Sequence, residues 1–361
     1  MSYIVYLTFL SVNLLIIRIY ENINNKSFVR TILFTILCLS IYIFGSIRFD
    51  VGNDYLNYYG HYWFITNKNG YISPDYFIFD ILSKFFSFTE YGYIGVFSIY
   101  FIITLSIILI ILKKYNILFW GFFTFVTWGL LFDTFDRIRQ MVVVAIFLLS
   151  LNNIEKNEFS MFIFKMMIAC TFHLSAVFLI PFYFIAKIRI NVVMLTLIVC
   201  ILVFGYIFSV WQHLIKYIYT ITPYYNNIYS ESDYSSQFNE LNSGLGVFGK
   251  IIFIYLNIIF APIEQRSKTL LSVGLIIYIL GIGNLNVERI SDYFLAIVII
   301  SFPYMIKKFK KIENKILIVF PMILFLLILF IKSIEQGYFK YQTIFGEEFK
   351  KQNFKERVYS K

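Results

Sequence analysis

Four short polar segments hold the residues in this sequence whose side chains suit chemistry. The first, RFDVGNDYLNYY, runs from Arg48 to Tyr59. Its guanidinium group suits a phosphate, because the planar fork donates two parallel hydrogen bonds. A carboxylate such as Asp54 can accept a proton from a hydroxyl, while Tyr55 and Tyr58 offer flat faces and hydroxyl groups to a sugar. An arginine that snorkels at the end of a membrane span, beside an aromatic belt, explains the same residues equally well.

The second segment, DTFDRIRQ, runs from Asp133 to Gln140 and leads into an apolar run. Arg137 and Gln140 are three positions apart and share a face of a helix, whereas Arg139 points elsewhere. Charge at the edge of a bilayer is costly, and it usually faces the protein interior or a water-filled cavity. Both arginines, Asp136 and Gln140 are therefore candidates for substrate binding. A local aspartate–arginine pair in a short turn is the alternative.

Two further candidates stand at the ends of later apolar runs. His173, in CTFHLSAVF, is the histidine deepest in an apolar context, whereas His61 and His213 lie in polar segments and are set aside. An imidazole can act as base, acid or hydrogen-bond donor, or it can be a satisfied structural residue. In ERISDYF, Arg289 and Asp292 share a helical face and either bind substrate or pair with each other.

Apolar runs must position all four segments. The 361 residues are 59% hydrophobic and 14% charged, whereas soluble domains are about 25% charged. The runs long enough to cross a bilayer leave little chain for a soluble domain. We expect one all-α integral membrane domain over 1–361, a helical bundle of about 11–13 spans. The expected spans are 3–20, 31–47, 91–112, 116–132, 139–152, 159–172, 174–186, 190–210, 247–262, 269–285, 292–306 and 316–332. The segment 76–89 is too short and polar for a clear crossing, and we expect it to be re-entrant or interfacial.

Basic residues in the short loops predict the orientation. Alternate loops carry lysine and arginine clusters, which are typical of the cytoplasmic side. This places the loop 48–75, the larger tyrosine-rich loop 211–246 and the charged tail 333–361 outside. The candidate residues of all four segments then lie on one outer face. Arginines gathered there, against the usual rule, favour an anionic ligand.

Several other function classes find no support in the sequence. The formal charge of +10 comes from lysines at span ends, which hold orientation against anionic lipid. We therefore expect no nucleic-acid partner. The three cysteines fit neither a metal site nor a disulfide framework. The sequence contains no metal-ligand set, nucleophile elbow or phosphate-binding glycine loop, so we expect neither a metal nor a cofactor.

The segments together resemble the EpsG family of polysaccharide polymerases, which is related to Wzy-type O-antigen polymerases. The similar segments are RFDVGNDYLNYY, DRIRQ, FHLSAVFLIPFYF, the tyrosine-rich outer loop and ERISDYF. The resemblance implies a GT-C-like membrane bundle with an outward-facing cavity. It also implies a metal-independent glycosyltransferase of the bacterial cytoplasmic membrane, active at the periplasmic or exterior face. Its expected substrates are oligosaccharides on undecaprenyl diphosphate, used in O-antigen, lipopolysaccharide or exopolysaccharide synthesis. Membrane lipid is an expected partner, and a chain-length regulator protein is one that this role allows.

In this hypothesis four arginines bind the leaving diphosphate: Arg48, Arg137, Arg139 and Arg289. Either Asp54 or His173 takes the proton of the attacking hydroxyl, with Asp54 slightly favoured. A flippase for the same lipid-linked sugars is the nearest alternative, although it favours polar residues along the spans and an internal repeat. An O-antigen ligase remains open. A membrane acyltransferase needs a histidine with access to the cytoplasm, and a receptor or structural role leaves the outer arginines unexplained.

Overall fold

A computed structural model describes residues 2–23, 28–67, 70–89, 91–211, 213–214, 217 and 244–346. These residues form helices and no β-strand, apart from one isolated bridge between Arg48 and Thr343. Most of the predicted outer loop 211–246 and residues 347–361 of the predicted tail lie outside the described residues. The expected all-α polytopic membrane fold is confirmed.

Length and apolarity identify the helices that can cross a membrane. Five are long and apolar enough, and two further pairs qualify if each bent pair counts as one span. Four apolar helices are shorter, namely 159–172, 174–185, 192–207 and 246–260. These shorter helices overlap predicted spans but have at most 17 residues, so the expected total of about 11–13 crossings stays a prediction. Ile4, Leu15 and Ile201 are among many large apolar side chains that the helices expose, as lipid-facing surfaces do.

The described chain packs as two compact units. The first unit holds the described residues of 1–153, 158–180 and 323–361, and the second holds those of 154–157 and 181–322. A single integral membrane domain stays a prediction.

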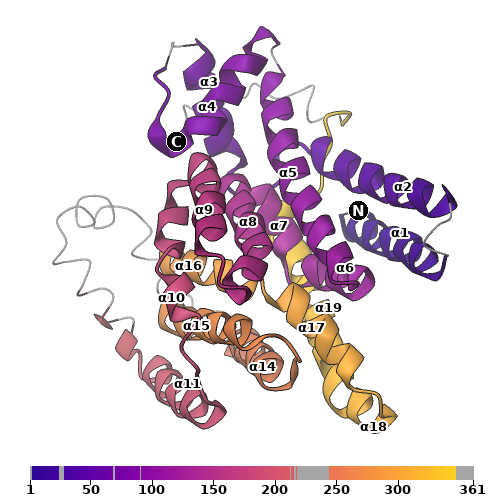
Figure 1. The fold of residues 1–361 in the computed structure, drawn as a ribbon. Helices are drawn as coiled ribbons and strands as arrows, with labels where there is room; N and C mark the ends of the chain where they lie inside the picture. Colours follow the sequence, from indigo (N-terminus) through magenta and orange to yellow (C-terminus); the bar gives the residue numbers. More distant parts are fainter. Residues whose placement is uncertain are drawn as a thin grey trace. The chain divides into compact units, whose positions relative to one another are not determined.

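Most of the candidate residues belong to the first unit, whose helices are drawn in Figure 1. These helices are α1 (Ser2–Asn22), α2 (Phe28–Ser46), α3 (Tyr55–Asn67), η1 (Pro74–Tyr76), α4 (Phe77–Phe85), η2 (Phe86–Phe88), α5 (Gly92–Lys114), α6 (Leu118–Thr127), α7 (Leu130–Asp136), α8 (Ile138–Glu155), α9 (Phe159–Phe172), η3 (Leu174–Leu179), α19 (Phe320–Glu335) and η6 (Gly337–Phe339). α1 lies beside α2 and α6, and α5 lies beside α2. Gly45 of α2 permits that approach, since a Cβ atom there would lie 2.1 Å from the ring of Phe101 in α5.

The second unit contains α10 (Phe182–Ile185), α11 (Val192–Ile207), α14 (Gly244–Phe260), α15 (Gln265–Gly281), α16 (Leu285–Leu295), α17 (Val298–Lys308), α18 (Ile312–Asn314) and the π-helical turn η5 (Lys315–Val319). Small residues let α15 and α16 pack closely. A Cβ atom at Gly274 would lie 2.6 Å from Cβ of Phe294. Asn284 caps the start of α16 by accepting hydrogen bonds from the backbone N–H groups of Asn286 and Val287.

The two ends of the first unit differ in character. At one end, Ser2 Oγ accepts a hydrogen bond from the backbone N–H of Tyr341 at 3.1 Å, so both termini of the described chain meet there. At the other end, Lys113 lies 4.2 Å from the centroid of the Phe34 ring. The predicted topology requires this arrangement, with the N-terminus and the tail together and the basic loops opposite. The side of the membrane that each end faces stays a prediction.

Candidate active site

The segment after α2 turns sharply and packs against the junction of α7 and α8. Asp50 and Gly52 both have positive φ angles, +50° and +111°. A Cβ atom at Gly52 would lie 2.6 Å from the carbonyl oxygen of Phe135, so only glycine fits this close approach. The backbone N–H of Asp54 then donates to Oδ1 of Asp136 at 2.9 Å. The structure therefore brings the first two candidate segments into direct contact.

The guanidinium group of Arg48 is buried at this contact, with 3% of the residue exposed. Nη1 donates to the carbonyl oxygen of Gly45 at 2.7 Å, and the group lies 4.8 Å from the centroid of the Phe135 ring. Nε and Nη2 have no hydrogen-bond partner in the described structure. Burial lowers the pKa of Arg48 to about 10, so the group remains charged at neutral pH with N–H donors to spare.

The end of the described chain covers Arg48. Phe49 N–H donates to the carbonyl of Gln342, and Ile344 N–H donates to the carbonyl of Ile47, at 2.9 and 3.0 Å. This antiparallel pairing puts Thr343 opposite Arg48. Part of the predicted charged tail therefore belongs to this part of the fold. Residues 333–335 end α19, and residues 342–344 pair with the segment after α2.

The segment 133–140 is helical on both sides of Arg137, which differs from the short turn expected between spans. Gly129, with φ +104°, breaks the predicted span 116–132 into α6 and α7, which bend by 56°. Asp133 lies in α7 and forms an ion pair with Arg137, so the local pairing considered above does occur for that arginine. Arg139 and Gln140 are buried in the first turn of α8.

Arg139 reaches a second cluster, on η1, α4 and α3. Its guanidinium group lies 3.4 Å from the centroid of the Tyr76 ring and donates to the carbonyl of Asp75, while Nε has no hydrogen-bond partner in the described structure. The imidazole of His61 stacks on the same tyrosine at 4.0 Å. The guanidinium of Arg139 and the imidazole of His61 are both too close to the Tyr76 ring to fit on the same face of it. The Tyr76 ring therefore lies between Arg139 and His61.

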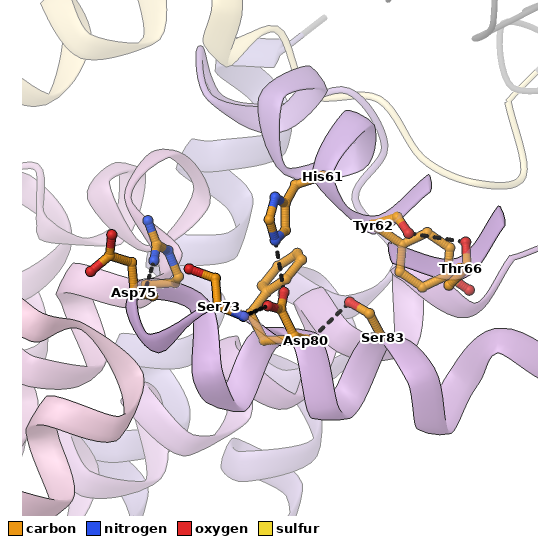
Figure 2. Close-up of polar contacts among 9 residues, drawn as sticks. His61, Tyr62, Thr66, Ser73, Asp75, Asp80 and Ser83 are labelled. Carbon is orange, nitrogen blue, oxygen red and sulfur yellow. Dashed lines mark hydrogen bonds and ion pairs between the residues drawn. The ribbon is translucent and has the colours of Figure 1, made fainter. Parts of the chain in front are cut away.

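His61 also binds a buried carboxylate. Its Nε2 lies 2.7 Å from Oδ1 of Asp80, and Figure 2 shows the imidazole directed at that carboxylate. Oδ2 of Asp80 accepts from the backbone N–H of Ser73 at 2.8 Å. The side chain of Asp80 is fully buried, while 24% of the His61 side chain is exposed.

The tyrosines chosen from the sequence face this region. Tyr58 is buried, and its ring lies 5.7 Å from that of Phe79 and 5.8 Å from the Arg139 guanidinium. Burial raises the pKa of Tyr58 to about 12, an effect that Arg139 partly offsets. Burial likewise raises the pKa of Tyr55, which Arg48 partly offsets. Both hydroxyl groups therefore stay protonated at neutral pH.

His173 lies at the same end of the first unit. It ends α9 with an extended backbone, φ −158° and ψ 120°, and it is half-buried. The ring of its neighbour Phe172 lies 5.8 Å from that of Tyr100, which in turn lies 6.0 Å from Phe79. These ring contacts connect the end of α9 to the helix that carries Asp80.

A sequence model of the EpsG family matches residues 31–343. The chain belongs to the EpsG family. A search of curated proteins and a search of solved structures both find no match. The family supports a role like that of a polysaccharide polymerase, in a membrane protein with several transmembrane helices. The EpsG match ends at Thr343, the residue opposite Arg48.

The EpsG match also covers the second unit, where Arg289 and Asp292 lie half-buried on α16. Their participation in the site of the first unit stays a prediction. A small hollow of about 200 Å³ in the second unit is lined by Glu155, Ala186, Lys187, Arg189, Glu264, Gln265 and Arg266. None of these is a candidate residue, and acidic and basic groups share its lining. The outward-facing cavity implied by the EpsG resemblance therefore stays a prediction.

Sequence reasoning missed His61 and Asp80 of this EpsG protein. A signal was present, because Asp80 is a lone carboxylate in the apolar run YFIFDILSKFF, and a buried carboxylate needs a partner. His61 was set aside because its own segment is polar. Residues 55–67 of the predicted outer loop instead form α3, whose buried face turns His61 toward α4. Among the described residues, no group of three or more His, Cys, Asp or Glu side chains is placed to hold a metal ion.

Proposed function

We propose that this protein is a polysaccharide polymerase that transfers a growing glycan from undecaprenyl diphosphate to a new lipid-linked repeat unit. Membership of the EpsG family supports the polymerase role. The observation that carries the site is the convergence of Arg48, Arg139, Asp54 and Asp136 at one end of the first unit. The reaction takes place at the outer face of the bacterial cytoplasmic membrane, as the basic loops of the sequence favour.

The arginines suit the leaving group. When the bond between the anomeric carbon and the diphosphate breaks, negative charge develops on the diphosphate oxygens, and fixed N–H donors stabilise it. Arg48 and Arg139 hold N–H groups without partners in the described structure, so they supply donors without first breaking an ion pair. Arg137 must exchange Asp133 for substrate. Arg289 remains the fourth proposed contact.

The acceptor supplies the nucleophile of the reaction. A hydroxyl group of the incoming repeat attacks the anomeric carbon of the donor glycan, the lipid diphosphate leaves with the bonding electrons, and a base takes the hydroxyl proton. Asp54 and His173 are the bases proposed from the sequence. Asp136 holds the backbone of Asp54, and Asn57 Nδ2 donates to Oδ1 of Asp54 at 3.2 Å. Tyr55, Tyr58, Gln140 and Asp292 are proposed to contact the sugars.

The decisive cellular experiment is deletion of the gene, followed by analysis of surface glycan length. A polymerase deletion leaves lipid that carries a single repeat. Loss of all surface glycan indicates a flippase or a ligase and contradicts the proposal.

A matched set of arginine substitutions tests the site in vitro. Purified protein in nanodiscs receives the lipid-linked repeat, and the products are resolved by length. Arg48→Lys and Arg139→Lys lose polymer formation, because an ammonium group lacks the planar fork. Arg18→Lys, at an exposed position near the end of α1, is the control and keeps it. Wild-type rates in all three variants at equal protein levels contradict the diphosphate site.

The base is tested in the same assay. If Asp54 is the base, Asp54→Asn keeps the fold and loses polymer formation by about a hundredfold or more, while His173→Ala loses less. The reverse ranking exchanges the two roles.

A further inference from the structure

The pair of His61 and Asp80 has the form of an oriented base. Asp80 uses both carboxylate oxygens within the protein, one toward His61 and one toward the backbone of Ser73. A carboxylate only accepts hydrogen bonds, so Nε2 of His61 carries the proton in this contact. The neutral imidazole then has its lone pair on Nδ1. No hydrogen bond to Nδ1 is found among the described residues.

The two side chains differ in exposure, unlike the partners of a surface ion pair. Asp80 is fully buried and His61 is partly exposed. Burial of a carboxylate costs free energy unless the group is hydrogen-bonded. The hydrogen bond from His61 lowers that cost and also fixes the position of Nε2. The opposite edge of the imidazole is left for another group.

The position of His61 relates it to the proposed site. Asp54 immediately precedes α3, and its carbonyl accepts a hydrogen bond from the backbone N–H of Tyr58 at 3.0 Å. The spacings of four and three residues therefore put Asp54, Tyr58 and His61 on one side of this segment. Asp54 and His61 are separated along the axis by roughly 10 Å, at 1.5 Å per residue. Arg139 lies beside Tyr58 and stacks on Tyr76, the ring on which His61 also stacks. The proposed diphosphate contact therefore lies beside the imidazole, separated from it by one tyrosine ring.

We propose that His61, in place of Asp54 or His173, is the base of the transfer reaction and that Asp80 is its positioning residue. Nδ1 accepts the proton from the attacking hydroxyl as the oxygen bonds to the anomeric carbon and the diphosphate leaves. The imidazolium that forms is stabilised by Asp80. Asp54 then holds a sugar hydroxyl. This inference rests on the polymerase function proposed above, and it assigns the base to a residue on the same side of this segment as Asp54.

Four variants in the nanodisc assay test the assignment. His61→Gln lowers kcat by about a hundredfold or more with KM little changed, and Asp80→Asn lowers kcat by a smaller factor. His213→Gln is the matched control, because His213 is exposed and its Nδ1 lies 2.7 Å from the carbonyl of Ser209. It keeps the wild-type rate. Asp54→Asn keeps more activity than His61→Gln.

A spectroscopic measurement on the unaltered protein separates positioning from folding. The chain has three histidines, so ¹⁵N-histidine labelling gives a resolvable spectrum, and His61→Gln assigns the His61 signals. The Nε2–H tautomer of His61 dominates in the wild type, and Asp80→Asn reduces its population. A wild-type spectrum with the proton on Nδ1 overturns the proposal even if the variants fail to fold.

The outcomes distinguish the two proposals. If the wild type extends the glycan and a folded His61→Gln variant does so at the wild-type rate, the base assignment is wrong and the polymerase function stands. If the wild type makes no polymer from the lipid-linked repeat, the polymerase function is wrong and the base assignment with it.

Discussion

Gly52 gives the sharpest test of the contact between the two candidate segments. Its φ angle of +111° is one that alanine adopts at a cost of about 1–3 kcal/mol. In Gly52→Ala, the new Cβ atom would also lie 2.6 Å from the carbonyl oxygen of Phe135 and 3.1 Å from Cα of Asp136. Both are backbone atoms, so the loop and the helix junction must separate.

That separation breaks the hydrogen bond from Asp54 N–H to Asp136. A hydrogen bond to a charged group contributes about 1.5–3 kcal/mol, which adds to the strain. Gly129→Ala is the matched control. Gly129 has nearly the same φ angle, +104°, but its nearest atom is Ser333 Oγ at 4.0 Å, so only the strain remains. The two substitutions should therefore differ by at least about 1.5 kcal/mol, roughly tenfold in the folding equilibrium.

The assay is titration of the purified protein with SDS in mild detergent, followed by circular dichroism. Midpoints are compared, because two compact units need not unfold together. Gly52→Ala unfolds at a lower SDS fraction than Gly129→Ala, and it loses polymer formation before it loses helix content. Equal midpoints for the two variants, with polymer formation intact in both, refute the contact.

The other predictions concern the same end of the first unit. Asp136→Ala leaves the backbone of Asp54 unheld and lowers stability by about 1–3 kcal/mol, measured by the same titration. Tyr341→Phe removes a hydrogen bond to a backbone carbonyl at the end of α2 and lowers stability by about 1 kcal/mol. In a variant without its native cysteines, a cysteine at Asn53 reacts with an impermeant thiol reagent in intact spheroplasts, whereas one at Lys310 reacts only after lysis. The opposite pattern reverses the proposed orientation.

Sequence periodicity and charge predict the parts of this fold that are local. The apolar runs predict the helices, and the polar segments predict where candidate residues gather. The sequence places Asp54 and Asp136 on the same outer face of the membrane protein, which is consistent with their approach. It does not predict the hydrogen bond between them. The break at Gly129 had a local signal, a glycine inside an apolar run, which the prediction of one continuous span passed over.

Long-range pairings were beyond reach for a physical reason. The contact between His61 and Asp80 depends on how α4 folds back on α3, and neither helix encodes that approach in its own periodicity. The pairing of Arg48 with Thr343 joins residues whose neighbours show no alternation typical of strands. A single sequence shows which secondary structure each segment prefers. These contacts depend instead on how segments far apart in the chain pack together.

The covering of Arg48 by the end of the described chain ties the site to the order of synthesis. Phe44, at the end of α2, and Tyr341 are hydrogen-bonded although they stand 297 positions apart. At about 5–20 residues per second, the ribosome adds the second of them roughly 15–60 s after the first. During that interval the first helices are already made, but residues 342–344, with which the segment around Arg48 pairs, are not. A chain that stops before Gln342 therefore contains nearly all of the helices and still lacks a closed site. Synthesis of residues 342–344 is thus the step that allows the segment around Arg48 to be covered.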